Sequence, residues 1–376
     1  MVRIAFLDRM PWDYRVDTPE RRPLGGSQSA LCYLARALAK AGHEVRTVTM
    51  TREPARIDGV DCLSARQGGY ALFGGADAVI VLNDPDPTVA EALRQVVGPE
   101  KLVMLWTQHD VDQPAVAAFA EPETRRRWDR IVFVSEWQAR AWRRRFGPEP
   151  EGIVIGNAMA PVFETLFDDG PVDDGPALAP RAPTLIYTST PFRGLDVLLD
   201  AFPLIRASVP EARLVVHSSL AVYQVAEAED AYRDLYRRAQ AMPGVDYRGA
   251  VSQPALAQAL GEALCFAYPS TFPETFCISA IEAMAAGCLA VLGDLGALAE
   301  TSQGLAELVP LAEDPAEYAR RFAERVIPFL AHPQALAPRL AHQRRHLLET
   351  ATWDRRAQTW GRWIEATLAG APAALK

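Results

Sequence analysis

The sequence predicts an α/β protein built from two Rossmann-like, doubly wound domains that face each other across a cleft. Its 376 residues suit two domains better than one. Short apolar runs alternate with helix-like segments from residue 2, and this alternation restarts at residue 184. Between the halves lies a stretch rich in Pro, Gly and acidic residues, which no core element tolerates. Apolar strands separated by helices indicate parallel sheets, whose ligands bind at the carboxyl ends of the strands.

The first domain is predicted over residues 1–163. Its first strand is expected at Val2–Leu7, and Gln28–Lys40 has apolar positions at helical spacing. Because short apolar runs followed by turn residues are typical of buried strands, further strands are expected at Glu44–Met50, Ala78–Leu82, Leu102–Trp106 and Arg130–Val134.

Residues 164–183 are interpreted as a linker, and the second domain is predicted over residues 184–352. An amphipathic helix, Trp353–Leu368, is expected after the second core is complete. Within the second domain, helices are expected near Asp196–Ser208, Tyr232–Ala241, Pro254–Gly261 and Phe276–Ala286, and strands at Thr184–Thr188, Ala212–His217, Val245–Tyr247, Ala263–Tyr268 and Leu289–Leu292.

The composition is that of a soluble globular protein, with 49% hydrophobic and 23% charged residues. The net charge of −8 argues against a nucleic-acid-binding protein, which usually has a basic face. No apolar run approaches the roughly 18 residues of a membrane span. The five cysteines are scattered and form no C-x-x-C pair, which favours buried free thiols in a reducing compartment. A cytoplasmic protein is therefore expected.

The densest chemistry lies in the segment Pro269–Gly287, PSTFPETFCISAIEAMAAG. A helix is expected to begin near Thr275, so the amides of Thr275, Phe276 and Cys277 would be unpaired helix N-terminal donors suited to a diphosphate. Glu274 stands at the mouth of this turn, and Glu282 lies two helical turns further on. The alternative is that Glu274 only favours the helix dipole and Glu282 is a solvated surface residue. Charge and spacing leave both interpretations open.

The pair Glu274 and Glu282 forms an E-x7-E pattern within P-E-T-F…E-A-M-A-A-G. This pattern resembles the donor-site signature of the family-4 retaining glycosyltransferases (glycosyl transferases group 1), which have the GT-B fold. The resemblance implies that Glu282 binds the ribose hydroxyls of a nucleotide-sugar donor. It also implies that Glu274 lies beside the transferred sugar, and that the following amides hold hydroxyls or phosphate.

Other stretches resemble the family in the expected order. Gly25 and Gly26, in L-G-G-S, resemble the glycine loop that lets the backbone approach phosphate and acceptor, although a plain helix-entry turn would look the same. His109 follows a predicted strand and resembles the family histidine that contacts the donor sugar; a histidine at this place is often only a loop residue. The segments Val132–Gln138 and Ile155–Asn157 also match, and the resemblance implies that the C-terminal helix, in 353–376, packs back on the first domain.

One departure from the family concerns the diphosphate. The family usually places an Arg and a Lys, five residues apart, after the first strand of its second domain. Here Arg193 stands at the Lys position and Thr188 at the Arg position, so one cation is missing. Arg193 can still make a bidentate contact to phosphate oxygens. The alternative interpretation is that Arg193 is only a surface residue before a helix.

Two segments suggest partners. The segment 125–145 holds eight arginines with Trp128, Trp137 and Trp142, so it is a candidate for peripheral contact with the cytoplasmic face of a membrane carrying lipid-linked acceptors; a helix on a Rossmann domain would look similar. The loop 9–23, with Trp12, Tyr14, Arg21 and Arg22, would suit an acceptor pocket.

The expected function is a retaining, metal-independent transfer of a sugar from a nucleoside-diphosphate sugar to a hydroxyl acceptor, in glycan, glycolipid or cell-surface polysaccharide synthesis. No D-x-D or clustered metal ligands appear, apart from Asp84 and Asp86, which Pro85 and Pro87 stiffen as a structural turn. Helix amides and Arg193 would then stabilise the leaving diphosphate, and no cofactor is expected. The sequence argues against a nicotinamide dehydrogenase, because L-G-G-S-Q-S-A lacks G-x-G-x-x-G and the second strand ends at Thr49–Thr51 without an acidic residue. A nucleotide-sugar epimerase and a non-catalytic nucleotide-sugar-binding protein remain open.

Overall fold

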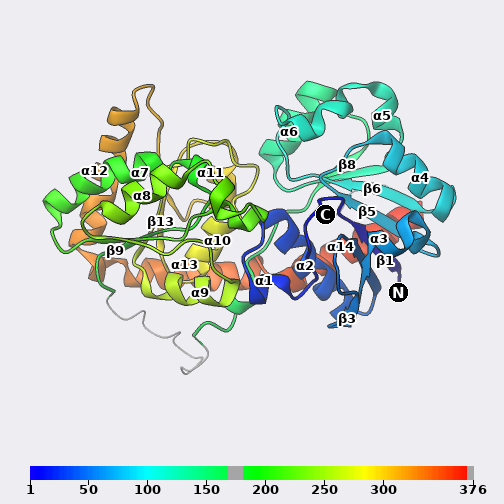
Figure 1. Ribbon diagram of the computed structural model, residues 1–376, viewed down its shortest axis with the longest axis horizontal. Helices are drawn as coiled ribbons and strands as arrows, with labels where there is room; N and C mark the ends of the chain where they lie inside the picture. The colour runs from blue at the N-terminus through cyan, green and yellow to red at the C-terminus, as the bar shows by residue number, and fades with distance from the viewer. Residues whose placement is uncertain (168–180, 371–376) are drawn as a thin grey trace. The chain divides into compact units, whose positions relative to one another are not determined.

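The computed structural model describes residues 1–167 and 181–370 (Figure 1). The chain forms two compact units. Unit 1 comprises Met1–Pro19, Gly25–Ala158 and Trp353–Lys376, and unit 2 comprises Glu20–Leu24 and Met159–Thr352. Unit 1 thus gives way to unit 2 after Ala158, earlier than the predicted boundary at 163. Most of the predicted linker, residues 168–180, lies outside the described residues.

Unit 1 contains a sheet that is parallel except at one edge, where β3 pairs antiparallel with β4. Its strand order is β3-β4-β2-β1-β5-β6-β7-β8. Strands β5 and β6 are buried along their whole length, as apolar strands with helices on both sheet faces must be. The strands are β1 (Arg3–Leu7), β2 (Glu44–Thr49), β3 (Ala55–Ile57), β4 (Val60–Ser64), β5 (Ala78–Leu82), β6 (Leu102–Trp106), β7 (Arg130–Phe133) and β8 (Gly152–Val154).

The helices of unit 1 begin where the sequence offers a cap. The Asp86 carboxylate accepts from the Thr88 amide at the start of α4, and the Ser135 hydroxyl accepts from the Gln138 amide at the start of α6. Asp84 and Asp86 both pair with Arg9, so their structural interpretation agrees with the geometry. The helices are α1 (Thr18–Arg21), α2 (Gly26–Lys40), α3 (Ala65–Gly68), α4 (Pro87–Val97), α5 (Pro122–Arg126), α6 (Glu136–Phe146) and α14 (Trp353–Leu368).

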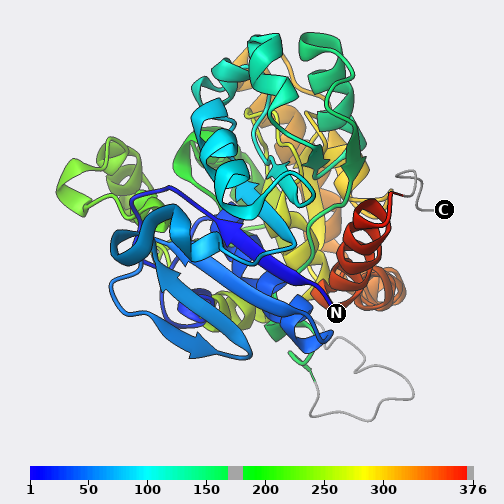
Figure 2. The same ribbon diagram turned by 90° about the vertical axis from the view of Figure 1, so that its right-hand side faces the viewer.

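The last helix, α14, packs on unit 1 (Figures 1 and 2). The ring of Trp360 meets Trp106 of β6 edge to face at 5.3 Å between centroids. Asp354, in the first turn of α14, forms an ion pair with Lys40 at the end of α2, at 2.5 Å. The helix ends at Leu368, and residues 371–376 lie outside the described part of the chain.

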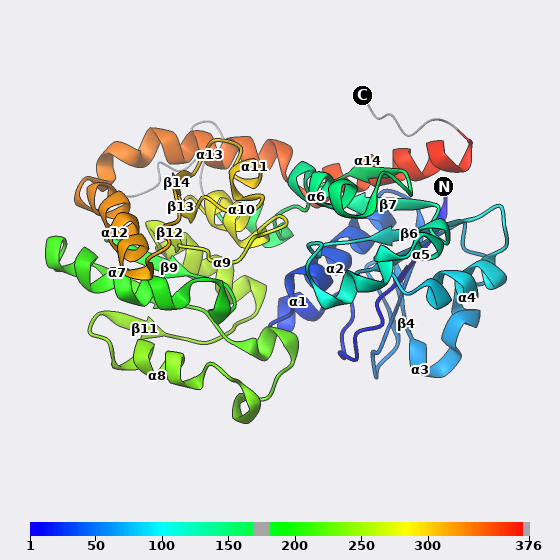
Figure 3. The same cartoon turned by 90° about the horizontal axis from the view of Figure 1, so that it is seen from above.

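Unit 2 has a fully parallel sheet in the order β11-β10-β9-β12-β13-β14 among the described residues. Figures 1 and 3 show α7 and α8 on one face of this sheet and α10 and α13 on the other. The strands are β9 (Thr184–Tyr187), β10 (Arg213–Val216), β11 (Val245–Tyr247), β12 (Cys265–Tyr268), β13 (Leu289–Gly293) and β14 (Glu307–Val309). The helices are α7 (Leu195–Ser208), α8 (Arg233–Ala241), α9 (Gln253–Glu262), α10 (Ile278–Ala285), α11 (Leu298–Thr301), α12 (Pro315–Ala331) and α13 (Ala337–Thr350).

The predicted start of the helix after β12 is wrong. We expected it near Thr275, but α10 begins at Ile278. Cys277, directly before it, has a left-handed backbone with φ of +73°, which a continuous right-handed helix does not contain. Thr275, Phe276 and Cys277 therefore form a turn between strand and helix. Apolar periodicity alone does not reveal such a backbone reversal.

Candidate functional site

Polar side chains gather at the carboxyl edge of the unit 2 sheet. Thr188 directly follows β9, His217 and Ser218 follow β10, and Glu274 lies in the turn after β12. All the strands are parallel, so these ends meet at the same edge of the sheet. Each of these residues is less than one-tenth exposed. This is the edge at which doubly wound sheets bind ligands.

Glu282 is buried in this region, at 2% exposure, so its alternative interpretation as a solvated surface residue is wrong. Its Oε1 accepts from the Ala160 amide at 3.2 Å and from Gln253 Nε2 at 3.1 Å. Burial raises the pKa of the Glu282 carboxyl to about 7, despite these two donors. The sequence did not indicate Gln253, which stands at the start of α9 and was not linked to Glu282 by any motif.

Glu274 is held by two side chains. Its Oε1 accepts from Arg193 Nη1 at 2.5 Å and from the Tyr268 hydroxyl. Burial opposes the charge of Arg193, but the nearby Glu274 carboxylate raises the pKa of Arg193 well above its usual value. The guanidinium also lies over the ring of Phe272, 4.6 Å from its centroid. The surface alternative for Arg193 is therefore wrong, and sequence analysis missed both its pairing with Glu274 and the role of Tyr268.

The turn before α10 is tightly packed against its neighbours. The Ala297 amide donates to the Glu274 carbonyl at 2.7 Å. Gly296 has φ of +65°, and a Cβ there would lie 2.5 Å from the Glu274 carbonyl oxygen, so only glycine fits. Because α10 begins at Ile278, the first-turn amides of this helix belong to Ile278 and its successors. Thr275, Phe276 and Cys277 are not part of that helix turn, which corrects the expectation.

Several buried polar atoms at this edge have no hydrogen-bond partner among the described residues. They are Thr188 Oγ1, Thr190 Oγ1, Arg193 Nε, His217 Nε2, Ser218 Oγ and Gln253 Oε1. Leaving one buried polar atom unpaired costs about 1–3 kcal/mol, so folded proteins rarely keep a cluster of them. A polar ligand or ordered water satisfies such atoms, and the cluster marks this edge as the candidate binding site.

In unit 1, His109 follows β6 and is fixed through its backbone. The His109 carbonyl accepts from Gln138 Nε2 at 2.9 Å and from Trp142 Nε1 at 3.0 Å. Burial lowers the pKa of the imidazole to about 4, so the ring is neutral near pH 7. Its Nδ1 is buried and has no partner within the described parts of the chain. A neutral, positioned ring can donate or accept a hydrogen bond but cannot neutralise a phosphate.

The predicted glycine loop stands at the start of α2. Gly25 precedes this helix with φ of −58°, and Gly26 is its first residue. Neither glycine has a positive φ, so the backbone conformation does not explain them. Behind the loop, the buried Asp8 accepts from the Tyr14 hydroxyl at 2.7 Å and from Gln28 Nε2 at 3.0 Å. Burial raises the pKa of Asp8, which sequence analysis did not single out.

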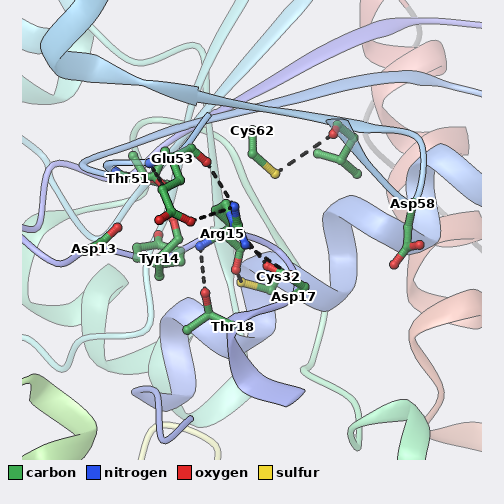
Figure 4. Close-up of polar contacts among 12 residues, drawn as sticks. Asp13, Tyr14, Arg15, Asp17, Thr18, Cys32, Thr51, Glu53, Asp58 and Cys62 are labelled. Carbon is green, nitrogen blue, oxygen red and sulfur yellow. Dashed lines mark hydrogen bonds and ion pairs between the residues drawn. The ribbon is translucent and has the colours of Figure 1, made fainter. Parts of the chain in front are cut away.

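In the loop 9–23, Tyr14 cannot contribute to the expected acceptor pocket. Tyr14 is 1% exposed and bonded to Asp8, so its ring cannot stack on a ligand. Arg15 pairs with Asp17 and with Glu53, each at 3.3 Å, which anchors the loop (Figure 4). Trp12 is half-buried, whereas Arg21 and Arg22 are exposed.

The segment 125–145 is not one basic helix. It contains the end of α5, the strand β7 and most of α6. Trp128 and Trp142 belong to the buried core of unit 1, and Trp137 is half-buried. Among residues 1–167 and 181–370, no helix is long and apolar enough to span a bilayer, and no group of three or more His, Cys, Asp or Glu side chains could hold a metal ion.

Comparison with known proteins identifies the fold. Residues 182–326 match the family model "Glycosyl transferases group 1". No curated protein sequence matches the chain. Among solved structures, a sucrose-phosphate synthase from Thermosynechococcus elongatus is 18% identical, with a TM-score of 0.69 over 98% of this chain and 99% of that one. An α,α-trehalose 6-phosphate synthase from Burkholderia multivorans is 14% identical, with a TM-score of 0.70 over 99% of this chain and 100% of that one.

Anabaena HepE, solved with UDP and glucose, is 14% identical, with a TM-score of 0.67 over 97% of this chain and 100% of that one. These likenesses confirm the predicted α/β fold with Rossmann-like units. This chain therefore has the GT-B fold, and its residues 182–326 carry the sequence pattern of the group 1 glycosyltransferases.

Proposed function

We propose that this chain is a retaining glycosyltransferase that moves a sugar from a nucleoside-diphosphate sugar to a hydroxyl acceptor without a metal ion. The observation that carries the proposal is the buried carboxylate of Glu282, which is bonded to Gln253, whose own Oε1 has no partner among the described residues. A carboxylate can accept hydrogen bonds from both hydroxyls of a ribose. The family match over residues 182–326, which contains Glu274 and Glu282, supports the same assignment.

The nucleotide end of the donor is assigned to Glu282. Its Oε1 already accepts two hydrogen bonds, which leaves Oε2 as the oxygen for a ribose hydroxyl. Gln253 keeps its Oε1 buried without a partner inside the described residues, so it can accept from a second hydroxyl of the same ribose. The first-turn amides of α10 are the proposed donors to the diphosphate.

The sugar end is assigned to Glu274, with Arg193 and Tyr268 orienting the carboxylate. An oriented carboxylate can accept from sugar hydroxyls and stabilise the positive charge that develops on the sugar carbon. His109 is proposed as a second sugar contact. Its neutral imidazole suits a hydroxyl better than a phosphate. We assign neither residue the role of nucleophile or base.

The first donors to test are UDP-sugars, since HepE was solved with UDP-glucose and the pneumococcal GtfA with UDP and GlcNAc. A thermal-shift screen should compare UDP-glucose, UDP-GlcNAc, GDP-mannose, ADP-glucose and dTDP-glucose. A donor at 100 times its Kd should stabilise the fold by about 2.7 kcal/mol. If none of these donors raises the melting temperature, the proposed function fails.

Turnover must then be separated from binding alone. Incubation of the stabilising donor with an acceptor library should yield a glycoside of unchanged anomeric configuration and a free nucleoside diphosphate. Conversion of the donor alone to its epimer would identify an epimerase. Binding without either product would identify a nucleotide-sugar-binding protein. Acceptors from glycan, glycolipid and polysaccharide synthesis in the cytoplasm, including lipid-linked ones, are the first to include.

A further inference from the structure

The edge formed by β9 and β10 carries a cluster of hydrogen-bond donors. Thr188, Thr190 and Ser218 each keep a buried hydroxyl oxygen without a partner in the described part of the chain, and Arg193 keeps its Nε–H unpartnered there. The three hydroxyl residues are between 1% and 6% exposed. Hydroxyls and an arginine N–H together suit an oxyanion, and phosphate is the oxyanion of the proposed donor.

This cluster is poor in positive charge. Position 188 holds a neutral threonine, and the guanidinium of Arg193 is already paired with Glu274 at 2.5 Å. A pyrophosphate that leaves during transfer carries growing negative charge, which needs a cation or a preorganised dipole. The hydroxyls supply dipoles only. Further positive charge near Thr188 would add to these dipoles when the donor binds.

His217 lies beside Thr188. The His217 amide donates to the Tyr187 carbonyl at 2.8 Å, so the residues that follow these two strands are neighbours. The ring Nδ1 is 3.2 Å from the Gly249 carbonyl. A carbonyl only accepts, so Nδ1 carries the hydrogen, and the neutral ring has its lone pair at Nε2. That Nε2 is buried and unpartnered among the described residues.

The surroundings keep the ring neutral until an anion arrives. Burial lowers the pKa of His217, and so does the charge of Arg248. The hydrogen bond to the Gly249 carbonyl raises this pKa, and so does Asp246, which is paired with Arg248 at 2.8 Å, but burial is the largest effect. Asp246 and Arg248 lie on the β11 side, whereas the β9 side presents the neutral Thr188. A bound phosphate would add negative charge at Nε2 and raise the pKa of the ring.

We propose that His217 takes up a proton from solvent when the pyrophosphate of the donor binds, and that its Nε2–H then donates to a phosphate oxygen. The proposal rests on the proposed function, because it needs a nucleoside-diphosphate sugar at this edge. The step is balanced: one proton moves from water to Nε2, no covalent bond in the donor changes, and Nδ1–H keeps its bond to Gly249. His217 thereby supplies the cation that position 188 lacks.

The test counts protons during binding. The nucleotide sugar that stabilises the fold in the thermal-shift screen is titrated calorimetrically in two buffers of different ionisation enthalpy. A nucleotide sugar is preferable to a nucleoside diphosphate, because a terminal phosphate titrates near about pH 6 and would obscure the count. At about pH 8, where Glu282 with its pKa of about 7 is mostly ionised, the wild-type protein should take up close to one proton.

The alkaline limb of the pH profile of donor affinity separates His217 from Glu282. Affinity should fall as the pH rises above about 8, by up to tenfold per pH unit, because His217 must gain a proton. His217→Asn should bind more weakly near neutral pH and lose this alkaline limb. The half-buried His346, whose Nε2 lies 2.8 Å from Gln303 Oε1, provides the matched control His346→Asn, which should keep the alkaline limb.

Donor binding without proton uptake at about pH 8, with an affinity that stays flat up to about pH 9, would overturn the role of His217 and leave the proposed function standing. Absence of binding by any of the screened donors would instead overturn the proposed function. Proton uptake is measured on the wild-type protein, so misfolding of His217→Asn cannot hide either result.

Discussion

Replacing Glu282 with glutamine should stabilise the empty protein at neutral and alkaline pH while weakening donor binding. The carboxyl has a pKa of about 7, against an ordinary value of 4.5. Each pKa unit corresponds to 1.36 kcal/mol, so this difference of about 2.5 corresponds to about 3 kcal/mol of folding free energy. The folded protein therefore binds a proton more tightly than the unfolded chain between about pH 4.5 and 7, so stability falls as the pH rises through this window.

The effect should depend on pH in a defined way. Below about pH 4.5 the carboxyl is protonated in both states, so Glu282→Gln should change stability little. Above about pH 7 the variant should be more stable by up to about 3 kcal/mol. Glutamine keeps an oxygen that can accept from the Ala160 amide, which preserves the local geometry. The side chain fills nearly the same volume, so no cavity confuses the comparison.

The assay is chemical unfolding from about pH 5 to 8.5, followed by far-UV circular dichroism and by hydrogen exchange of peptides from β12 and α10. Tryptophan fluorescence is unsuitable, because every tryptophan lies in unit 1. A stability difference that is the same at both pH extremes would refute the reasoning, since it would mean that the carboxylate is not desolvated in the folded protein.

The same variant tests the ribose assignment. Glu282→Gln should weaken both the nucleotide sugar and the free nucleoside diphosphate, whereas Glu274→Gln should spare the diphosphate and reduce sugar transfer. A 2′-deoxy or 3′-deoxy donor should bind wild type more weakly and lose little further affinity to the variant. If removing a ribose hydroxyl from the donor costs the same binding affinity in wild type and in the variant, Glu282 does not hold the ribose.

Three further predictions concern the remaining site residues. Activity should survive excess EDTA, because amides and hydroxyls replace a cation; a strict requirement for Mg²⁺ or Mn²⁺, restored on addition, would contradict this. Arg193→Met should weaken UDP binding by about 1.5–3 kcal/mol in calorimetry and also destabilise the fold by about 3 kcal/mol, because Glu274 stays buried without its cation. The double variant Arg193→Met/Glu274→Gln should regain the lost folding stability. An unchanged UDP affinity in Arg193→Met would show that Arg193 does not bind the donor. His109→Ala should reduce turnover far more than nucleotide affinity, and equal turnover would dismiss its sugar contact.

The sequence by itself determined the local structure and the motif. The apolar runs Ala78–Leu82 and Leu102–Trp106 are strands with the predicted ends, because a strand buried on both faces needs continuous apolar residues. The pair of glutamates was identified through its spacing and flanking residues, and the family match over 182–326 includes it. These features depend on neighbours in the chain, so sequence patterns contain them.

The tertiary structure alone decided which partners these residues have. Arg193 reaches Glu274 because β9 and β12 are adjacent in the sheet, although many elements separate them in the chain. Gln253, at the start of α9, donates to Glu282 of α10 although they lie 29 positions apart in the chain, and His217 meets Gly249 because β10 pairs with β11. Burial, which sets the pKa of Glu282 and of His109, also arises only from packing. Strand order and burial are collective properties of the folded chain, so no local pattern could have revealed these contacts.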